Sequence, residues 1–211
     1  MSNKKYIPAL TSKWLTPLYD ALVEGPMSVS RLRKDMLAQM GDLNGKRILD
    51  VGCGTGTMAI LIKKKFPVAE VVGLDGDLQI LAIARSKAER PKVEIRFEQG
   101  MSFGLPYPDG SFDFVLTSVM LHHLNKEDKQ KTARKMYRAL CSGGRLLGAD
   151  LGESRGFFGK ILRPFLRHLE RVADNLDGSL IMLLENAGFK NYKEMGRYFF
   201  GVISLFQSAK S

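Results

Sequence analysis

The sequence is poor in cysteine and lacks any long apolar run. Its two cysteines, Cys53 and Cys141, lie far apart without paired spacing, which argues against a disulfide scaffold and a cysteine-based metal site. The first residues, MSNKKYIPALTSKW, lack the apolar core and the small-residue cleavage site of a secretory signal. No stretch approaches the ~18 uncharged apolar residues that a membrane span requires. We therefore expect a cytoplasmic protein that contacts membranes at most peripherally.

Charge is also not concentrated in blocks. The 211 residues include 32 Lys and Arg against 22 Asp and Glu, a formal net charge of +10, but the basic residues are scattered along the chain. Neither an arginine-rich segment nor a basic stretch with interleaved aromatics is present, so we do not expect nucleic acid as a partner. An apolar fraction of 45% excludes intrinsic disorder and indicates a globular domain with a hydrophobic core.

The N-terminal part of the chain has helical periodicity. Apolar residues recur at helical spacing in residues 13–24 and again in 29–40, with a break at Gly25 and Pro26 between them. We therefore predict an N-terminal helical cap over residues 1–45, followed by a single structural unit over residues 46–211.

From residue 46 onwards, short apolar runs alternate with segments of helical period. This alternation predicts βαβ units and a parallel sheet covered by helices on both faces. The predicted strands are 47–51, 69–75, 93–97, 111–118 and 145–151, and the predicted helices are 57–66, 78–89, 127–140 and 178–189. Two last strands, 191–198 and 200–210, have no helix between them and must pair antiparallel. The expected fold is a Rossmann-like, three-layer α/β sandwich with a seven-stranded, mostly parallel sheet and an antiparallel C-terminal strand.

The most informative segment is the glycine-rich stretch LDVGCGTG at residues 49–56, where the first predicted strand meets a helix. A parallel sheet presents its ligands at this position. Asp50 stands directly before the loop, where a carboxylate repels a pyrophosphate but can receive an ammonium group. The third glycine follows the second by two residues, not by the three of the dinucleotide pattern. Asp75 ends the next strand, as an acceptor for two ribose hydroxyls would. A ligand with an amino-acid end and a nucleoside end, such as S-adenosylmethionine, fits all three features.

From about residue 46 to the C-terminus, the order of motifs resembles that of the class I S-adenosylmethionine-dependent methyltransferases. LDVGCGTGTMAI is similar to the first motif of this family and VVGLDGDLQIL to the second. FEQGMSFGLPYPDGSFDFVLTSVMLHHL resembles the adenine-side loop and fourth strand, and RALCSGGRLLGADL the approach to the fifth. The patterns LPYPDGSFDFV and LHHL are most similar to the small-molecule branch that includes ubiquinone and menaquinone C-methyltransferases. WLTPLYD at residues 14–20 resembles the helix that covers the cofactor in that branch.

The resemblance implies S-adenosylmethionine as the cofactor. The implied cofactor-binding residues are Tyr19, Asp50, Gly52, Cys53, Gly54, Asp75, Gly76, Met101, Ser102 and Thr117. Asp50 and nearby loop backbone groups would hold the methionine end, Asp75 the ribose, and the segment around Met101 the adenine. Many relatives have Asp at the position of Met101 to bond the adenine amino group. Because Met101 cannot do this, the Ser102 hydroxyl or its backbone N–H would hold the adenine edge.

The candidate catalytic residue is His122, with Asp150 as the next candidate for a base. The alternative for His122 is packing in the first turn of a helix. His122 and His123 are adjacent and point in different directions, and no other cluster has ligand spacing, so we expect no metal. Cys53 has two interpretations. It is either a reactive thiol or a residue that fits the loop because it is small and leaves its backbone amide free.

The predicted function is transfer of the sulfonium methyl group to a small, apolar acceptor. The basic, amphipathic segment 156–172 is open to three interpretations: an acceptor-covering lid, a core-facing helix or a membrane-surface contact. Two rival functions share the fold: a nicotinamide-dependent oxidoreductase, and a non-catalytic partner subunit. The glycine spacing, Asp50 and the terminal hairpin argue against the first, and the intact loop with Asp50 and Asp75 argues against the second.

Overall fold

The structure is a computed structural model, which describes residues 29–152, 179–199 and 201–211. Three predicted segments lie wholly or mostly outside these residues: the helix 13–24 with Tyr19, the cap over 1–45 and the segment 156–172. Within them, the helices are α2 (Val29–Gln39), α3 (Thr57–Lys65), α4 (Leu78–Glu89), α5 (Lys126–Ala139) and α8 (Ser179–Asn186), with short 3₁₀ turns η1 (Ser102–Gly104) and η2 (Leu121–His123). The strands are β1 (Arg47–Val51), β2 (Glu70–Asp75), β3 (Arg96–Gln99), β4 (Phe112–Ser118), β5 (Leu140–Leu151), β6 (Lys190–Tyr198) and β7 (Ile203–Ala209).

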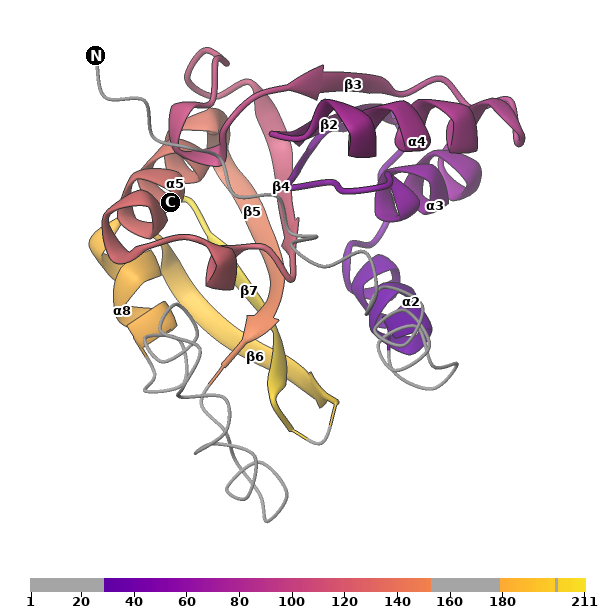
Figure 1. Cartoon of the computed structure of the whole chain (residues 1–211). Coiled ribbons are helices and arrows are strands. Elements are labelled where there is room, and N and C mark those ends of the chain that lie inside the picture. The colour runs from indigo at the N-terminus through magenta and orange to yellow at the C-terminus, as the bar shows by residue number, and fades with distance from the viewer. Residues whose placement is uncertain (1–28, 153–178, 200) are drawn as a thin grey trace, which may run out of the picture.

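The described strands form one seven-stranded sheet in the order β3-β2-β1-β4-β5-β7-β6 (Figure 1). The pairs β1–β2, β1–β4, β2–β3 and β4–β5 are parallel. Strand β7 runs antiparallel to both of its neighbours, β5 and β6. It is therefore the one reversed strand of the sheet, and the predicted mostly parallel sheet with an antiparallel C-terminal strand is confirmed.

Helices lie on both faces of the sheet (Figure 1), and the sheet separates two hydrophobic layers. Successive residues of a strand point to opposite faces, so in β1 Ile48 packs in one layer and Leu49 in the other, both fully buried. One layer includes buried residues of α2, α3 and α4, and the other includes buried residues of α5 and α8. Burial on both faces explains why the central strands are almost wholly apolar.

Two strands differ from their predicted bounds. Strand β3 begins at Arg96, three residues after the predicted start, because ladder pairing with β2 begins at Arg96 opposite Val72. Val93 and Ile95 still pack against the core, which is what their apolar pattern reflects. Strand β5 begins at Leu140, before the predicted residue 145. Its register against β4 shifts between Phe112 and Phe114, so Gly143 and Gly144, which follow the predicted helix, lie inside an irregular strand.

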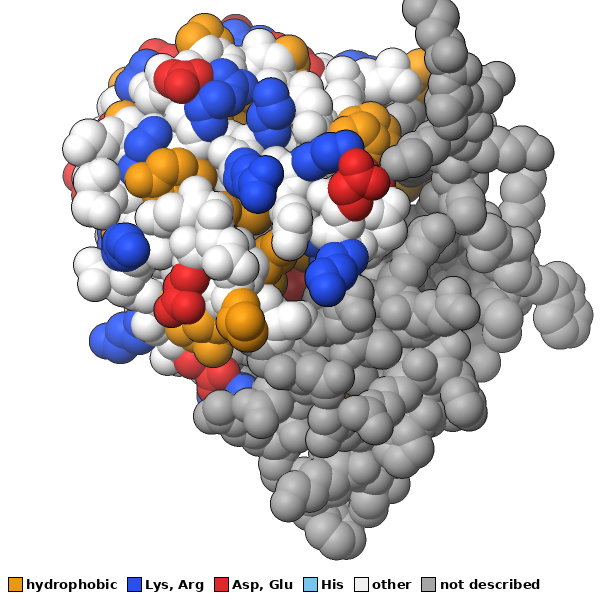
Figure 2. Space-filling model, turned by 90° about the vertical axis from the view of Figure 1, so that its left-hand side faces the viewer, with side chains coloured by type: hydrophobic (Ala, Val, Ile, Leu, Met, Phe, Trp, Pro, Cys, Tyr) orange, Lys and Arg blue, Asp and Glu red, His pale blue; other side chains and the backbone are white. Residues whose placement is uncertain are grey.

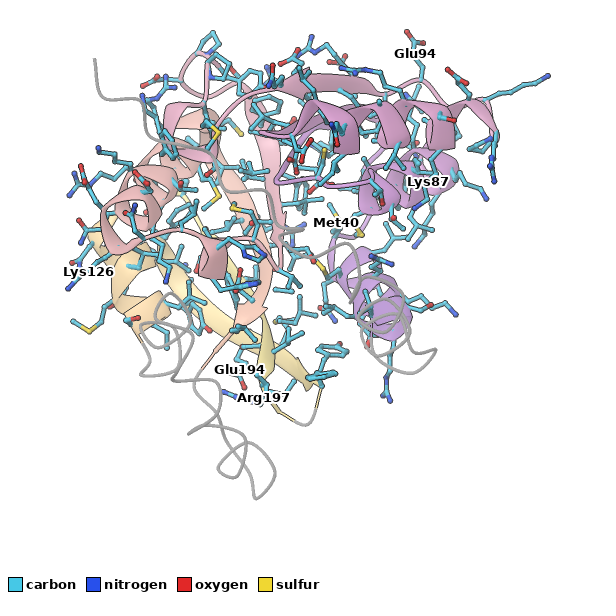
Figure 3. All side chains as sticks on the ribbon, viewed as in Figure 1. Met40, Lys87, Glu94, Lys126, Glu194 and Arg197 are labelled. Carbon is cyan, nitrogen blue, oxygen red and sulfur yellow. The ribbon has the colours of Figure 1, made fainter. Side chains whose placement is uncertain are left out.

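Polar side chains near the end of β6 pair within the strand and with α2. Arg197 donates from Nε and Nη2 to the two carboxylate oxygens of Glu194, each over 2.7 Å, near the end of β6 (Figure 3). The neighbouring Tyr198 hydroxyl donates to Asp35 Oδ2 over 2.6 Å. Burial and this hydrogen bond raise the pKa of Tyr198 to about 12. Strand β6 is thereby fastened to α2, 163 residues away in the chain.

The outer face of α5 and α8 carries dispersed charges. In Figure 2, Lys and Arg side chains on this face are spread among uncharged and acidic ones. Among the described residues, no helix is long and apolar enough to cross a membrane.

Candidate active site

Acidic and hydroxyl side chains gather at the carboxyl edge of the parallel strands. Asp50 lies on β1 between Gly73 of β2 and Leu116 of β4, and Thr117 lies opposite Val51. Both Asp50 and Thr117 are buried. Within the described part of the chain, Asp50 Oδ2 and Thr117 Oγ1 are buried atoms without a hydrogen-bond partner. Buried polar atoms are almost always paired in proteins, so these two are candidates for ligand contacts.

Asp50 is also electrostatically unusual. The pKa of its carboxyl is raised from 3.8 to about 7, first by burial and second by the nearby charge of Asp75, whereas the Arg33 guanidinium acts in the opposite direction. A cationic group placed beside Asp50 would favour the carboxylate and offset both effects. The position therefore suits an ammonium group and repels a phosphate.

The glycine loop combines a packed position with an open one. Gly52 and Gly54 have φ values of 73° and 54°, in the left-handed region. A Cβ at Gly52 would overlap the Met120 side chain, so this glycine lets the loop after β4 approach the loop after β1. Among the described residues, a Cβ at Gly54 would meet no heavy atom within 4 Å. The space above Gly54 is therefore a candidate position for a ligand.

The loop amides are already engaged within the protein. The N–H groups of Gly52 and Cys53 both donate to Leu74 O, over 2.8 and 3.1 Å. The N–H of Gly54 donates to Asp75 Oδ2 over 2.9 Å. The prediction of a free backbone amide at Cys53 is therefore wrong, because this N–H binds Leu74 O of β2 and holds the loop in place. What the loop offers a ligand is open space and the Asp50 carboxylate.

Cys53 has the character of a packing residue. It is buried, and burial raises the pKa of its thiol well above the usual range, with the charges of Asp50 and Asp75 acting in the same direction. A nucleophilic cysteine needs the opposite environment, one that favours the thiolate. The geometry gives the interpretation as a reactive thiol no support.

Asp75 has room for ligand contacts beyond its internal ones. Its Oδ2 accepts from Gly54 N and its Oδ1 accepts from Asp77 N over 3.0 Å. Each carboxylate oxygen can accept about two hydrogen bonds, so one position remains on each. Next to it, Gly76 O accepts from Gln99 Nε2 over 3.3 Å, which connects the ends of β2 and β3.

The segment expected beside an adenine is only partly available. Met101 is exposed and immediately precedes η1. The Ser102 hydroxyl is buried and lies 3.0 Å from the Thr132 hydroxyl of α5. Because this contact fastens η1 to α5, the Ser102 backbone N–H and the Met101 side chain are the better candidates for the adenine edge.

His122 and Asp150, which the sequence offers as two separate candidates for a base, lie in direct contact. His122 Nδ1 lies 2.8 Å from Asp150 Oδ1, and both side chains are buried. The residues are 28 positions apart, but His122 follows β4 and Asp150 is near the end of β5, its parallel neighbour. The predicted fold makes β4 and β5 neighbours, and adjacent parallel strands bring their carboxyl ends together. The strand order alone could therefore have predicted that His122 and Asp150 lie close to each other. Among the described residues, no group of three His, Cys, Asp or Glu could hold a metal ion.

Comparison with known proteins agrees with this geometry. Residues 48–144 match a family described as "Methyltransferase domain". The chain is 40% identical over 125 residues to a demethylmenaquinone methyltransferase of Thermus thermophilus, covering 59% of this chain and 56% of that protein. The YcgJ protein of Bacillus subtilis has a similar fold, with a TM-score of 0.70 and 21% identity over 86% of this chain and 98% of that one. Phosphoethanolamine N-methyltransferase 2 of Haemonchus contortus, solved with S-adenosyl-L-methionine, has a TM-score of 0.65 and 22% identity over 78% of this chain and 38% of that one.

In its sheet order, in the loop with two flanking aspartates and in the match over residues 48–144, the chain is similar to the class I S-adenosylmethionine-dependent methyltransferases. Within that class it resembles the demethylmenaquinone methyltransferases, as the sequence motifs predicted. The chain spans little more than half the length of these curated relatives.

Proposed function

We propose that this protein transfers a methyl group from S-adenosylmethionine to a small, apolar acceptor. The observation that carries the proposal is the pair of buried, unpartnered oxygens, Asp50 Oδ2 and Thr117 Oγ1, at the carboxyl edge of adjacent strands. We expect a ligand that lies along this edge to contact both. It must be cationic near Asp50 and must carry hydroxyls near Asp75, which is the charge distribution of this cofactor.

Each part of the cofactor has a partner among the described residues. Asp50 suits the ammonium of the methionine end, and the open space at Gly54 admits the chain that joins it to the ribose. Asp75, with one free position on each oxygen, suits the two ribose hydroxyls. Gly76, Met101 and the Ser102 backbone would flank the adenine. Thr117 is left to face the ribose or the methyl group.

Bound there, the cofactor supplies a methyl group already activated by positive sulfur, so the protein mainly has to align the acceptor and exclude water. His122 is our candidate for the base that removes a proton from the acceptor. Its imidazole lies at the carboxyl edge of β4, beside the loop that packs on Gly52. A positioned base of this kind contributes roughly 10²–10⁴-fold to a rate.

For the acceptor, we infer a hydroxyl-activated aromatic carbon of the demethylmenaquinol type. The support is the similarity to curated demethylmenaquinone methyltransferases and the presence of a buried histidine that can take a phenolic proton. We further propose that the protein acts in the cytoplasm, which agrees with its two free cysteines, Cys53 and Cys141.

The test has a binding arm and a transfer arm. Calorimetry should show saturable binding of S-adenosylhomocysteine and no comparable binding of NAD. Methyl-labelled S-adenosylmethionine should transfer label to a short-chain demethylmenaquinol in preference to amines, simple phenols, phospholipid or RNA. NAD binding without S-adenosylhomocysteine binding would establish the oxidoreductase alternative instead. Binding without transfer to any acceptor would favour the non-catalytic subunit, and transfer to an amine would overturn the acceptor class alone.

A further inference from the structure

The Asp150 carboxylate is saturated with hydrogen-bond donors. Its Oδ2 accepts from the backbone N–H groups of Met120 and Leu121, over 3.0 and 2.7 Å. Its Oδ1 accepts from the N–H of Leu151 and lies against His122 Nδ1, each at 2.8 Å. The residue is fully buried. Because both of its oxygens are committed to donors within the protein, Asp150 is badly placed to meet a substrate itself.

This arrangement determines where the hydrogen of the His122 ring lies. An ionised carboxylate can only accept hydrogen bonds, so the His122 nitrogen that faces it must carry the hydrogen. In the neutral ring, Nδ1 is then the donor and Nε2 keeps its lone pair. Asp150 therefore selects the tautomer in which the nitrogen away from the carboxylate can accept a proton.

The same carboxylate holds a strained turn. Val119 has a φ of 52°, which a β-branched residue rarely adopts, and its N–H donates to Ala149 O over 2.7 Å. The next two residues, Met120 and Leu121, are the ones whose amides bind Asp150. Met120 in turn packs against Gly52 of the glycine loop. Strain of this kind persists only where the surrounding contacts enforce it, and here it brings the His122 turn beside the glycine loop.

We propose that Asp150 is a positioning residue, which fixes both the place and the tautomer of His122 so that Nε2 is the proton acceptor in methyl transfer. This role rests on the proposed function. In the step, the phenolic proton of the acceptor moves to His122 Nε2 and an electron pair of the activated ring carbon forms a bond to the methyl carbon. The hydrogen on that ring carbon then leaves as a proton to water, which restores the aromatic ring. The carbon–sulfur bond breaks and its electron pair stays on sulfur, which becomes a neutral thioether. Nδ1–H keeps its hydrogen bond to Asp150 throughout.

The direct test is the tautomer of His122 in the unmodified protein. Nitrogen-15 spectra of the imidazoles, recorded at about pH 8.5 where histidine is neutral, should show protonated Nδ1 and unprotonated Nε2 for His122. The chain has only three histidines, and His122→Gln identifies the signal by its disappearance. A protonated Nε2 in the unmodified protein would overturn the proposal without the need for any Asp150 variant.

Asp150→Asn tests the cause of that tautomer. If the amide oxygen of the variant keeps the hydrogen bonds from Met120 and Leu121, its NH₂ group faces Leu151 N–H and His122 Nδ1. In the flipped orientation the NH₂ group would face two backbone N–H donors instead of one, which is less favourable. In the favoured orientation Nδ1 has to accept, so the ring hydrogen moves to Nε2. We expect the nitrogen spectrum to show this exchange. Asp113→Asn is the matched control, because Asp113 accepts from Arg47 N at the opposite edge of the sheet and should leave the tautomer unchanged.

Kinetics with labelled cofactor and a short-chain demethylmenaquinol complete the test. Asp150→Asn and His122→Gln should each lower kcat by about 100-fold or more while the KM for the cofactor changes by less than about threefold. The double variant should be no slower than the worse single one. An Asp150→Asn enzyme with the original tautomer, or with near-normal kcat, would refute the positioning role. Absence of S-adenosylhomocysteine binding would refute the proposed function instead, and the tautomer measured in the same sample would still decide whether Asp150 orients His122.

Discussion

The backbone N–H of Gly54 donates to Asp75 Oδ2 over 2.9 Å, which joins the glycine loop after β1 to the carboxylate at the end of β2. The two parts of the proposed cofactor site are therefore one hydrogen-bonded unit. Asp75 both offers acceptors to a ligand and fixes the loop over which that ligand would lie. Loss of its carboxylate should affect binding in two ways at once.

Asp75→Ala should weaken S-adenosylhomocysteine binding by about tenfold or more, because two hydroxyls lose a charged acceptor. Asp77→Ala is the matched control. Asp77 is two residues away and caps α4 by accepting from Gln79 N and Ile80 N. Its loss should cost about 0.5–2 kcal/mol of stability and leave the affinity unchanged. Calorimetry and thermal melting of both variants separate these effects. Equal affinity in the Asp75 variant and the unmodified protein would remove Asp75 from the site.

Gly54→Val should abolish S-adenosylhomocysteine binding in a protein that remains folded. The new side chain enters the space above the loop, where no heavy atom of the described residues lies within 4 Å of a Cβ. Gly45→Val controls for backbone strain, because Gly45 also has a positive φ, of 70°, and open surroundings, but lies before β1 and away from the loop. Circular dichroism should show both variants folded. Loss of binding in the Gly45 variant as well would mean that strain, and not the occupied space, is responsible.

Much of the fold could be predicted because local and tertiary signals agree. The strand at 47–51 was predicted with its observed bounds, since residues 48–51 are buried on both faces and a glycine loop ends it. Strand β3 was misplaced by three residues because apolar alternation reports burial of Val93 and Ile95, whereas strand bounds depend on pairing with β2. Pairing across the sheet is a tertiary property that periodicity does not contain.

In the candidate site too, some residues could be identified from sequence motifs, whereas the contacts between loops could not. Asp50 and Asp75 were identifiable because each lies at a strand end in a motif of fixed spacing. The contact between His122 and Asp150 depends on how two loops close over the ends of β4 and β5, and the strained φ of Val119 has no signature in the sequence. Nor could the contact between Met120 and Gly52 be anticipated, because no motif joins the two loops.

Alkylation should distinguish the two cysteines. Cys53 is buried and its thiol pKa is raised by burial, whereas Cys141 is partly exposed. Brief treatment of the native protein with iodoacetamide at about pH 8 should therefore label Cys141 and leave Cys53 unmodified. Unfolding in denaturant should expose both to the reagent. Mass spectrometry of peptides identifies the sites, and rapid native labelling of Cys53 would revive the interpretation of this residue as a reactive thiol.

The last prediction concerns pH and follows from Asp50, whose pKa is raised from 3.8 to about 7. Between these values the folded protein holds a proton that the unfolded chain has lost, so Asp50 makes the free energy of unfolding fall as pH rises from about 4 to about 7. Asp50→Asn should remove this dependence. At about pH 8 it should melt higher than the unmodified protein, by roughly 2–4 °C for each kcal/mol recovered.

Binding should show the opposite preference, because an ammonium group requires the carboxylate form of Asp50. At about pH 6, S-adenosylhomocysteine should therefore release a proton on binding, and its affinity should weaken by up to about tenfold for each further pH unit below 7. Calorimetry in two buffers of different ionisation enthalpy counts the protons. Asp50→Asn should bind more weakly and release none through this position. Proton release identical in the variant and the unmodified protein would show that the ammonium group does not lie beside Asp50.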